Sequence, residues 1–213
     1  MNLFLIRHGE SVGNKLGKIQ GCLDFELSDL GKRQAELVGE FFKTTQLDYI
    51  YSSDLERAYQ TAYAIAKNKE ANVHKWDKVR EVYLGPFQGL SREEIFLQYP
   101  EAKERSILTS GVMGTETTNT LTERCRYVVN QLQRAHSKHN VAIVSHGGFI
   151  SIFLMYLMLG DAWKDKHRPF QIDNTSITHI EWKGIGNSPL FHYVNRNNHL
   201  IFDKEDQKKG YCS

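Results

Sequence analysis

Two short apolar segments that each run directly into a histidine and a glycine constrain this chain more than any other feature. The first spans residues 3–9, Leu-Phe-Leu-Ile-Arg-His-Gly, and the second spans residues 141–148, Val-Ala-Ile-Val-Ser-His-Gly-Gly. Four consecutive apolar residues bounded by a glycine turn are typical of a strand that is buried on both faces of a sheet. Parallel strands end at the same edge of their sheet, so His8 and His146 should face one pocket if these strands are neighbours.

Further strands and helices alternate along the chain and predict an α/β fold with a mostly parallel sheet. Strands are expected at 48–51 and 176–182. Three helices are expected to begin at a cap: one at Ser28 or Asp29, one at Asp54, and one at a capping box at Ser91, which ends before Pro100. A long helix is expected around Leu121, and another is expected to start at Gly147-Gly148. Residues 106–119 are rich in glycine, threonine and serine, which indicates a loop over the pocket mouth.

Length and composition favour one globular domain over residues 1–213. Apolar residues make up 40% of the chain, charged residues 24%, and the net charge is +2, which predicts no nucleic-acid or membrane partner. Cys22, Cys125 and Cys212 are too widely spaced for a zinc ribbon or a disulfide framework. No apolar stretch is long enough for a signal peptide or a membrane span. We therefore expect a cytoplasmic protein, and the sequence carries no signal for its oligomeric state.

Two arginines add positive charge near the two histidines. Arg7 precedes His8, and Arg57 follows the strand expected at 48–51. A guanidinium binds phosphate oxygens through two parallel hydrogen bonds, and nearby cations favour the neutral imidazole that a nucleophile requires. Phosphoryl transfer needs little beyond positioning and charge stabilisation, and no histidine spacing typical of a metal site is present. The pattern predicts a metal-free phosphate pocket formed by Arg7, His8, Arg57 and His146.

An acid is also needed to protonate the leaving oxygen. Glu81, in the segment Val-Arg-Glu-Val-Tyr-Leu-Gly at 79–85, is the best candidate. We expect this carboxyl group to donate a proton to the leaving group.

Residues 7–14, Arg-His-Gly-Glu-Ser-Val-Gly-Asn, resemble the first signature of the histidine phosphatase, or phosphoglycerate mutase-like, superfamily. Later stretches are similar to further motifs of that superfamily and occur in the same order. They are Leu27-Ser28 with Gly31 and Gln34-Ala35, residues 53–62, Arg80-Glu81 with Gly85 and Gly89, Ser145-His146-Gly147-Gly148, and residues 174–177. Phe25 and Gln88 depart from residues that the superfamily often has, which affects the expected loop shape and substrate fit only.

The resemblance implies a three-layer α/β/α fold and a role for each matched residue. His8 would be phosphorylated, while Arg7, Arg57 and His146 hold the phosphate. Asn14 and the backbone N–H of Gly147 would assist in binding it. Glu81 would donate a proton and then act as the base for water. The substrate would be a small phosphorylated metabolite, and neither a metal nor a cofactor would be needed.

Three functions are compatible with these motifs: a phosphomonoester hydrolase, a cofactor-dependent phosphoglycerate mutase, and a non-catalytic protein that binds a phosphorylated ligand. The superfamily's mutases carry a long insertion between the glutamate segment and the second histidine, and residues 82–145 leave little room for one. Residues 85–90, Gly-Pro-Phe-Gln-Gly-Leu, are closer to the mutases. The intact set of chemical residues favours an enzyme, and the short spacing favours the hydrolase.

Overall fold

The computed structural model describes residues 1–67, 69, 71–103 and 106–200. Cys212 lies outside these residues, and Cys22 and Cys125 are both free thiols. The six strands are β1 (Asn2–Arg7), β2 (Tyr49–Ser52), β3 (Val73–Lys75), β4 (Asn140–Ser145), β5 (Ile177–Glu181) and β6 (Leu190–Arg196). The α-helices are α1 (Val12–Lys15), α2 (Asp29–Phe42), α3 (Glu56–Lys67), α4 (Arg92–Gln98), α5 (Thr118–His136) and α6 (Gly147–Leu159).

The strands form one sheet in the order β3-β2-β4-β1-β5-β6. β1 and β4 are parallel neighbours with Arg7 opposite Ser145, and the pairs β2–β4 and β2–β3 are also parallel. Only β5 runs against the others, because it is antiparallel to both β1 and β6. The prediction of a mostly parallel sheet is therefore confirmed, and the two histidine-bearing strands are adjacent.

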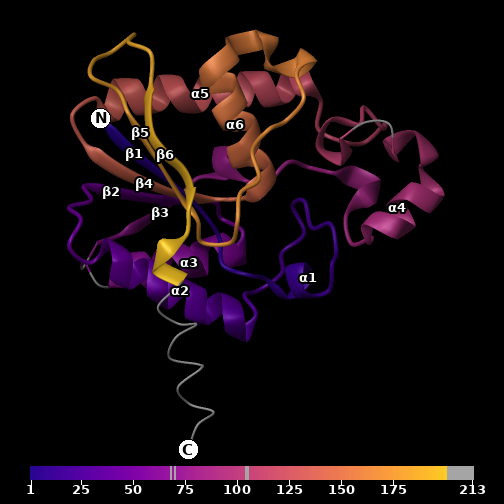
Figure 1. Ribbon diagram of the computed structural model, residues 1–213, viewed down its shortest axis with the longest axis horizontal. Coiled ribbons are helices and arrows are strands. Elements are labelled where there is room, and N and C mark those ends of the chain that lie inside the picture. Colours follow the sequence, from indigo (N-terminus) through magenta and orange to yellow (C-terminus); the bar gives the residue numbers. More distant parts are fainter. Residues whose placement is uncertain (68, 70, 104–105, 201–213) are drawn as a thin grey trace, which may run out of the picture.

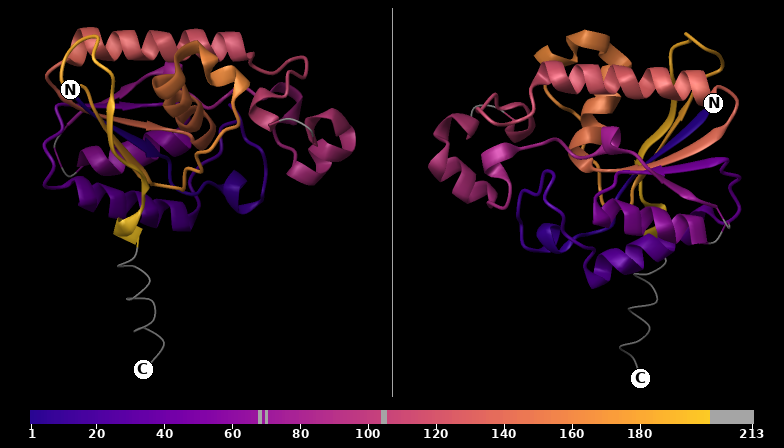
Figure 2. Two further views of the ribbon diagram at one scale, coloured as in Figure 1. Left: turned by 45° about the horizontal axis from the view of Figure 1, so that its top comes forward. Right: turned by 180° about the vertical axis from the view of Figure 1, so that it is seen from behind.

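Helices cover both faces of the sheet, as Figure 1 and the two views of Figure 2 show. Successive residues of β1 alternate between the two layers. Leu3 and Leu5 pack with α5 and α6, whereas Phe4 and Ile6 pack with α2 and α3. This alternation explains why the strand is apolar throughout, and it confirms the three-layer arrangement.

The capping signals in the sequence predicted the starts of α2 and α4. Ser28 caps α2, and Ser91 forms a capping box with Glu94 at α4. α6 begins at Gly147 as expected, while α5 begins at Thr118, so the expected loop ends two residues earlier. Residues 107–109 of that loop form a short 3-10 helix.

The expected cap at Asp54 is wrong. α3 begins at Glu56, whose backbone N–H donates to Asp24 Oδ1 at 2.7 Å. The Asp54 carboxylate instead accepts from Arg80 Nε at 2.6 Å and also from Arg80 Nη2. The Asp54 carboxylate thus binds Arg80, a charged residue distant in sequence, and does not cap the helix as its local sequence position predicted.

Two strands were not predicted, and their sequences explain why. β3 has only three residues, with a burial pattern that is largely exposed. β6 is exposed or half-buried at every position, so it lacks the apolar alternation that marks a strand. Among the described residues, no helix combines the length and the apolar character needed to cross a membrane.

Candidate active site

His8 leaves the sheet directly after β1 and is 3% exposed. Its backbone N–H donates to the carbonyl oxygen of Ser145 at 2.9 Å, which joins the ends of β1 and β4. The ring Nδ1 lies 2.6 Å from the carbonyl oxygen of Gly9. A carbonyl oxygen can only accept, so Nδ1 carries the proton and Nε2 of the neutral ring keeps its lone pair.

Arg57 faces this unprotonated nitrogen. Its Nε–H donates to His8 Nε2 at 3.3 Å, and the guanidinium is 1% exposed. The two terminal nitrogens donate to the carbonyl oxygens of Leu23 and Gly21, each at 2.8 Å. These carbonyl groups fix the plane of the guanidinium against the imidazole without neutralising its charge.

His146 completes the pocket from the end of β4. Its ring centroid lies 5.0 Å from that of His8, and its Nε2 lies 2.8 Å from Ser53 Oγ. The other nitrogen, Nδ1, is buried and has no hydrogen-bond partner among the described residues, and the same is true of Arg7 Nε. Arg7 Nη1 donates to the Ile172 carbonyl oxygen at 2.6 Å. Buried donors without partners are uncommon, and an oxyanion placed here would satisfy both.

The electrostatics of the pocket keep both imidazoles neutral. Burial lowers the pKa of His8 well below its ordinary 6.5, and the positive charges of Arg57 and Arg7 lower it further. Burial likewise lowers the pKa of His146, with Arg57 the largest charge contribution. A neutral imidazole is the form that can attack phosphorus.

Glu81 lies at the N-terminus of α6. Its oxygens accept from the backbone N–H groups of Gly148 at 3.0 Å, Phe149 at 2.8 Å and Val82 at 2.9 Å. Two of the free N–H groups of this helix terminus, those of Gly148 and Phe149, are thus occupied by Glu81. Gly147 instead lies against Arg7, since a Cβ atom added at Gly147 would be 3.3 Å from Arg7 Nε.

The structure thus brings Arg7, His8, Arg57, His146, Glu81 and Gly147 together. Asn14 has a different environment. Its Oδ1 accepts from the Ser11 backbone N–H at 3.1 Å within the capping box of α1. Among the described residues, no hydrogen bond connects its side chain to the two histidines or the two arginines.

Four residues that support the active site lie in motifs matched in the sequence, but no role was predicted for them. Ser53 holds His146, and Thr61 Oγ1 accepts from the Gly9 N–H at 3.0 Å. Asn174 Nδ2 donates to the carbonyl oxygen of His8 at 3.0 Å. Ser53 could have been found, because it follows β2 at the same edge of the sheet.

Thr175 also holds this strand end, and it does so in a strained conformation. Its N–H donates to the carbonyl oxygens of Arg7 at 3.0 Å and His8 at 3.3 Å, and its φ is +54°. A β-branched residue seldom adopts this left-handed region, and such strain is common at functional sites.

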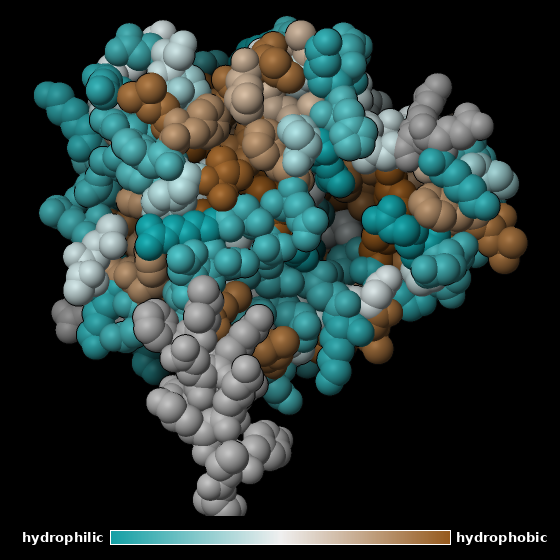
Figure 3. Space-filling view, viewed as in Figure 1, coloured by the Kyte–Doolittle hydropathy of each residue, from teal (hydrophilic) through white to brown (hydrophobic). Residues whose placement is uncertain are grey.

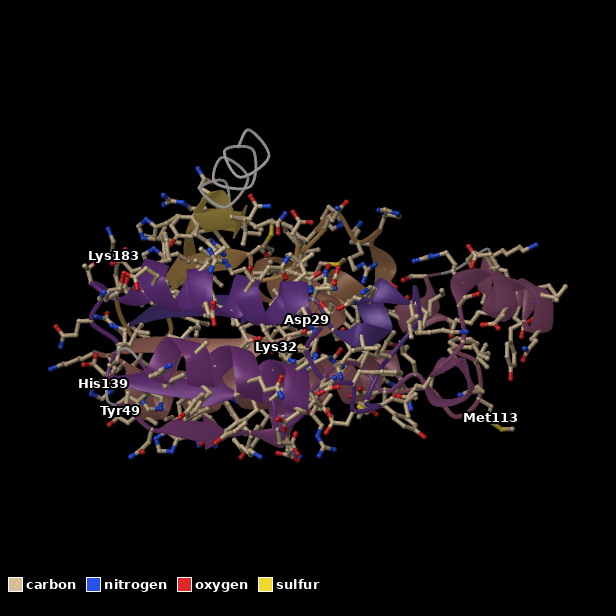
Figure 4. All side chains as sticks on the ribbon, turned by 90° about the horizontal axis from the view of Figure 1, so that it is seen from below. Asp29, Lys32, Tyr49, Met113, His139 and Lys183 are labelled. Carbon is tan, nitrogen blue, oxygen red and sulfur yellow. The ribbon has the colours of Figure 1, made fainter. Side chains whose placement is uncertain are left out.

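A cavity of about 660 Å³ opens over the pocket. Arg7, Glu81, Gly147 and Gly148 line this cavity together with residues of α4 and residues 106–108. Figure 3 shows hydrophobic surface recessed between the body of the molecule and the segment carrying α4. Met113, in the loop that was expected to cover the pocket mouth, is 94% exposed and lies at the edge of the molecule (Figure 4).

Within the described ranges, no three histidine, cysteine, aspartate or glutamate side chains are placed to hold a metal ion. The positive charge around His8 comes from Arg57 and Arg7.

The model of the histidine phosphatase superfamily (branch 1) matches residues 3–195. This chain belongs to that superfamily. It is 34% identical over 186 residues to phosphoserine phosphatase 1 of Hydrogenobacter thermophilus, covering 85% of this chain and 87% of the relative. It is 31% identical over 169 residues to a metal-independent phosphoserine phosphatase of Arabidopsis thaliana, covering 76% of this chain and 71% of the relative.

A solved structure shares the fold. The mycobacterial glucosyl-3-phosphoglycerate phosphatase complexed with VO3 superposes with a TM-score of 0.80 at 29% identity, covering 92% of this chain and 99% of that one. The expectations of an enzyme from this superfamily and of its α/β fold are confirmed.

Proposed function

We propose that this protein hydrolyses small phosphate monoesters through a phosphohistidine intermediate on His8. The observation that carries this proposal is the fixed tautomer of His8. Its Nδ1–H is held by the Gly9 carbonyl oxygen, and its Nε2 lone pair faces the Arg57 guanidinium. A buried, neutral and oriented imidazole beside a cation is suited to attack a phosphate dianion.

The phosphate would be held by Arg7, Arg57 and His146. The unpartnered Arg7 Nε and His146 Nδ1 support this assignment, because each would gain an acceptor from a phosphate oxygen. Ser53 Oγ accepts from the Leu55 N–H at 3.3 Å, so its own proton can go to His146 Nε2 and leave Nδ1 as a donor. The roles of Asn14 and of the Gly147 N–H continue to rest on the motif resemblance.

The reaction would have two steps. First, His8 Nε2 forms a bond to phosphorus as the bond to the ester oxygen breaks, and Glu81 gives its proton to that oxygen. Second, water attacks the phosphohistidine, Glu81 takes the water proton, and inorganic phosphate leaves with the P–N bond broken. The place of Glu81 in the cavity wall beside Arg7 supports its role as this acid and base.

The substrate class follows from the size of the cavity and from the relatives. A cavity of about 660 Å³ accommodates a small organic phosphate. The relatives named above are phosphatases of phosphoserine and of a glycosylated phosphoglycerate. A small phosphorylated metabolite is therefore the substrate we propose, with neither metal nor cofactor, for a single-domain protein in the cytoplasm.

The test is to trap the intermediate in the presence of EDTA. Brief incubation with a radioactive phosphate monoester should label the wild-type protein with acid-labile, alkali-stable phosphate that maps to His8. His8→Ala should take up no label and should release no phosphate, while its circular dichroism spectrum stays that of the wild type. The buried charges of Arg7 and Arg57 make a metal unnecessary, so EDTA should not reduce labelling.

Three results would contradict the proposal. Label on a serine or an aspartate would exclude the phosphohistidine, and a loss of labelling in EDTA that zinc or magnesium restores would exclude the metal-free mechanism. Turnover that depends on a bisphosphate primer would identify a mutase instead.

A further inference from the structure

Arg168 is a cation of the cavity that the two proposed steps do not use. It lies in the segment between α6 and β5, and it lines both the active-site cavity and a second, adjoining cavity of about 660 Å³. Lys103, Ser106 and Leu108 are the other residues that the two cavities share. Arg168 therefore lies where the active-site cavity adjoins the second cavity.

The Arg168 guanidinium has no hydrogen bond and no ion pair with any residue in the described part of the chain. Arg80 and Arg124, two other arginines of this molecule, are paired with Asp54 and Glu116 respectively. Burial lowers the pKa of Arg168; the charge of Glu81 is the largest opposing effect, and Arg92 lowers the pKa further. A half-buried cation that has no counter-ion among the described residues is costly unless a ligand supplies the anion.

Among the described residues that line the active-site cavity, four cationic side chains accompany a single carboxyl group, that of Glu81. The four are Arg7, Arg92, Lys103 and Arg168. Of these, Arg7 is assigned to the phosphate, which leaves three cations around the part of the substrate that departs. The remaining wall is mostly apolar and includes Ile19, Leu84, Phe96, Ile107, Leu108 and Phe170.

We propose that Arg168 binds a carboxylate on the leaving group, so that the preferred substrates are phosphate esters of small hydroxy acids. This inference rests on the proposed hydrolase function and specifies its substrate class. A guanidinium presents two parallel N–H groups that match the two oxygens of a carboxylate. The apolar wall fits a short carbon skeleton between the phosphate and that carboxylate.

The test compares two esters that differ only at the proposed contact. 3-Phosphoglycerate carries a carboxylate where glycerol 3-phosphate carries a hydroxymethyl group. The wild-type protein should prefer the acid in kcat/KM by about 10- to 100-fold, the range for a hydrogen bond to a charged group. Arg168→Met should remove most of that preference, chiefly through KM, and Arg168→Lys should retain part of it. Lys183→Met removes one exposed positive charge that does not line the cavity and should leave the preference intact (Figure 4).

Several outcomes would overturn the inference while the hydrolase function stands. Equal losses on the two esters would mean that Arg168 has no role specific to the carboxylate. A stronger dependence on Arg168 with fructose 1,6-bisphosphate than with 3-phosphoglycerate would mean that the subsite takes a second phosphate. A wild-type protein that forms phosphohistidine but does not prefer the acid would also refute the inference.

A binding measurement decides the inference without turnover. 3-Phosphoglycerate is titrated calorimetrically into the His8→Ala variant, with and without the added Arg168→Met substitution. The added substitution should weaken binding by about 10- to 100-fold for the acid and much less for glycerol 3-phosphate. Equal weakening would overturn the inference, whereas absent phosphate release from every ester by the wild type would overturn only the proposed function.

Discussion

The protonation state of His8 is set by its surroundings. Burial and the charges of Arg57 and Arg7 act in the same direction, whereas the Gly9 carbonyl oxygen opposes them. A histidine whose pKa is lowered is neutral at every pH above that lowered value, so His8 should stay neutral where an ordinary histidine is half protonated.

This state can be observed by NMR. The ¹³Cε1 and ¹Hε1 resonances of His8 should not titrate between pH 7.5 and about 6, because a free histidine has its midpoint near 6.5. The His8→Ala variant assigns the resonance by its absence. A midpoint at or above 6.5 would show that the arginines do not control this ring.

The role of Glu81 as a proton donor can be distinguished from a role in positioning alone. Glu81→Gln preserves the shape and one acceptor oxygen for the helix N–H groups, but it cannot donate a proton as an acid does. Phosphorylation of His8 by an alkyl ester should slow by about 10²–10⁴-fold, the range of general acid catalysis. p-Nitrophenyl phosphate has a leaving group that departs without a proton, so its first step should slow far less. Single-turnover kinetics on both esters measure that step, and equal losses would assign Glu81 a positioning role only.

Among the elements, α2 is joined near its N-terminus to the loop that follows the nucleophile, at Glu10. Ser28 N–H donates to the Glu10 carbonyl oxygen at 2.9 Å, and Gln34 Oε1 accepts from the Glu10 N–H at 2.8 Å. Gly31 lies so close to Glu10 that a Cβ atom would overlap the Glu10 backbone. The absence of a side chain at Gly31 therefore determines how α2 approaches the loop.

Gly31→Ala should destabilise the protein by about 2 kcal/mol or more, because neither backbone can move out of the overlap without disturbing a helix or the active-site loop. Urea unfolding measures this change. Lys32→Ala, an exposed neighbour in the same helix, should change the free energy of unfolding by less than about 0.5 kcal/mol. A Gly31→Ala protein with wild-type stability would show that the contact is not close.

The elements also show which features the sequence could predict. β1 and β4 were predictable because burial on both faces gives each strand an uninterrupted apolar segment. Each strand is also followed directly by an active-site histidine, His8 after β1 and His146 after β4. The partner of Asp54 and the occupancy of the α6 N-terminus by Glu81 were not predictable, since both depend on contacts between residues far apart in the chain. Arg168 could not be assigned either, because a lone arginine in a loop has no local pattern that marks a cavity.

At the scale of the whole molecule, buried histidines make stability depend on pH. The pKa values of His8 and His146 are well below 6.5, and burial lowers the pKa of His199 to about 4. In the unfolded chain histidines titrate near 6.5, so below that pH the unfolded state binds more protons than the folded state. Stability should be fully present above about pH 7 and should fall as the pH decreases through 6.5.

Each of the two buried active-site histidines should contribute a slope of up to about 1.4 kcal/mol per pH unit below 6.5. Urea unfolding between pH 7 and 5.5 measures the total slope. His8→Gln removes one of these groups and should reduce the slope below pH 6.5. Above pH 7, the pH dependence of the free energy of unfolding should change little. An unchanged slope in this variant would mean that His8 is protonated in the folded protein.

The hydrogen bonds from Asn174 and Thr175 to the end of β1 have a consequence for synthesis on the ribosome. Asn174 is 166 positions later than His8, yet it helps to fix the backbone of that residue. A nascent chain that has already emerged as far as β4 and α6 therefore still lacks the contacts that hold its nucleophile in place. Catalytic competence should appear late and abruptly during translation, once residues 172–176 have cleared the exit tunnel, and ribosome-stalled chains of increasing length would show that threshold.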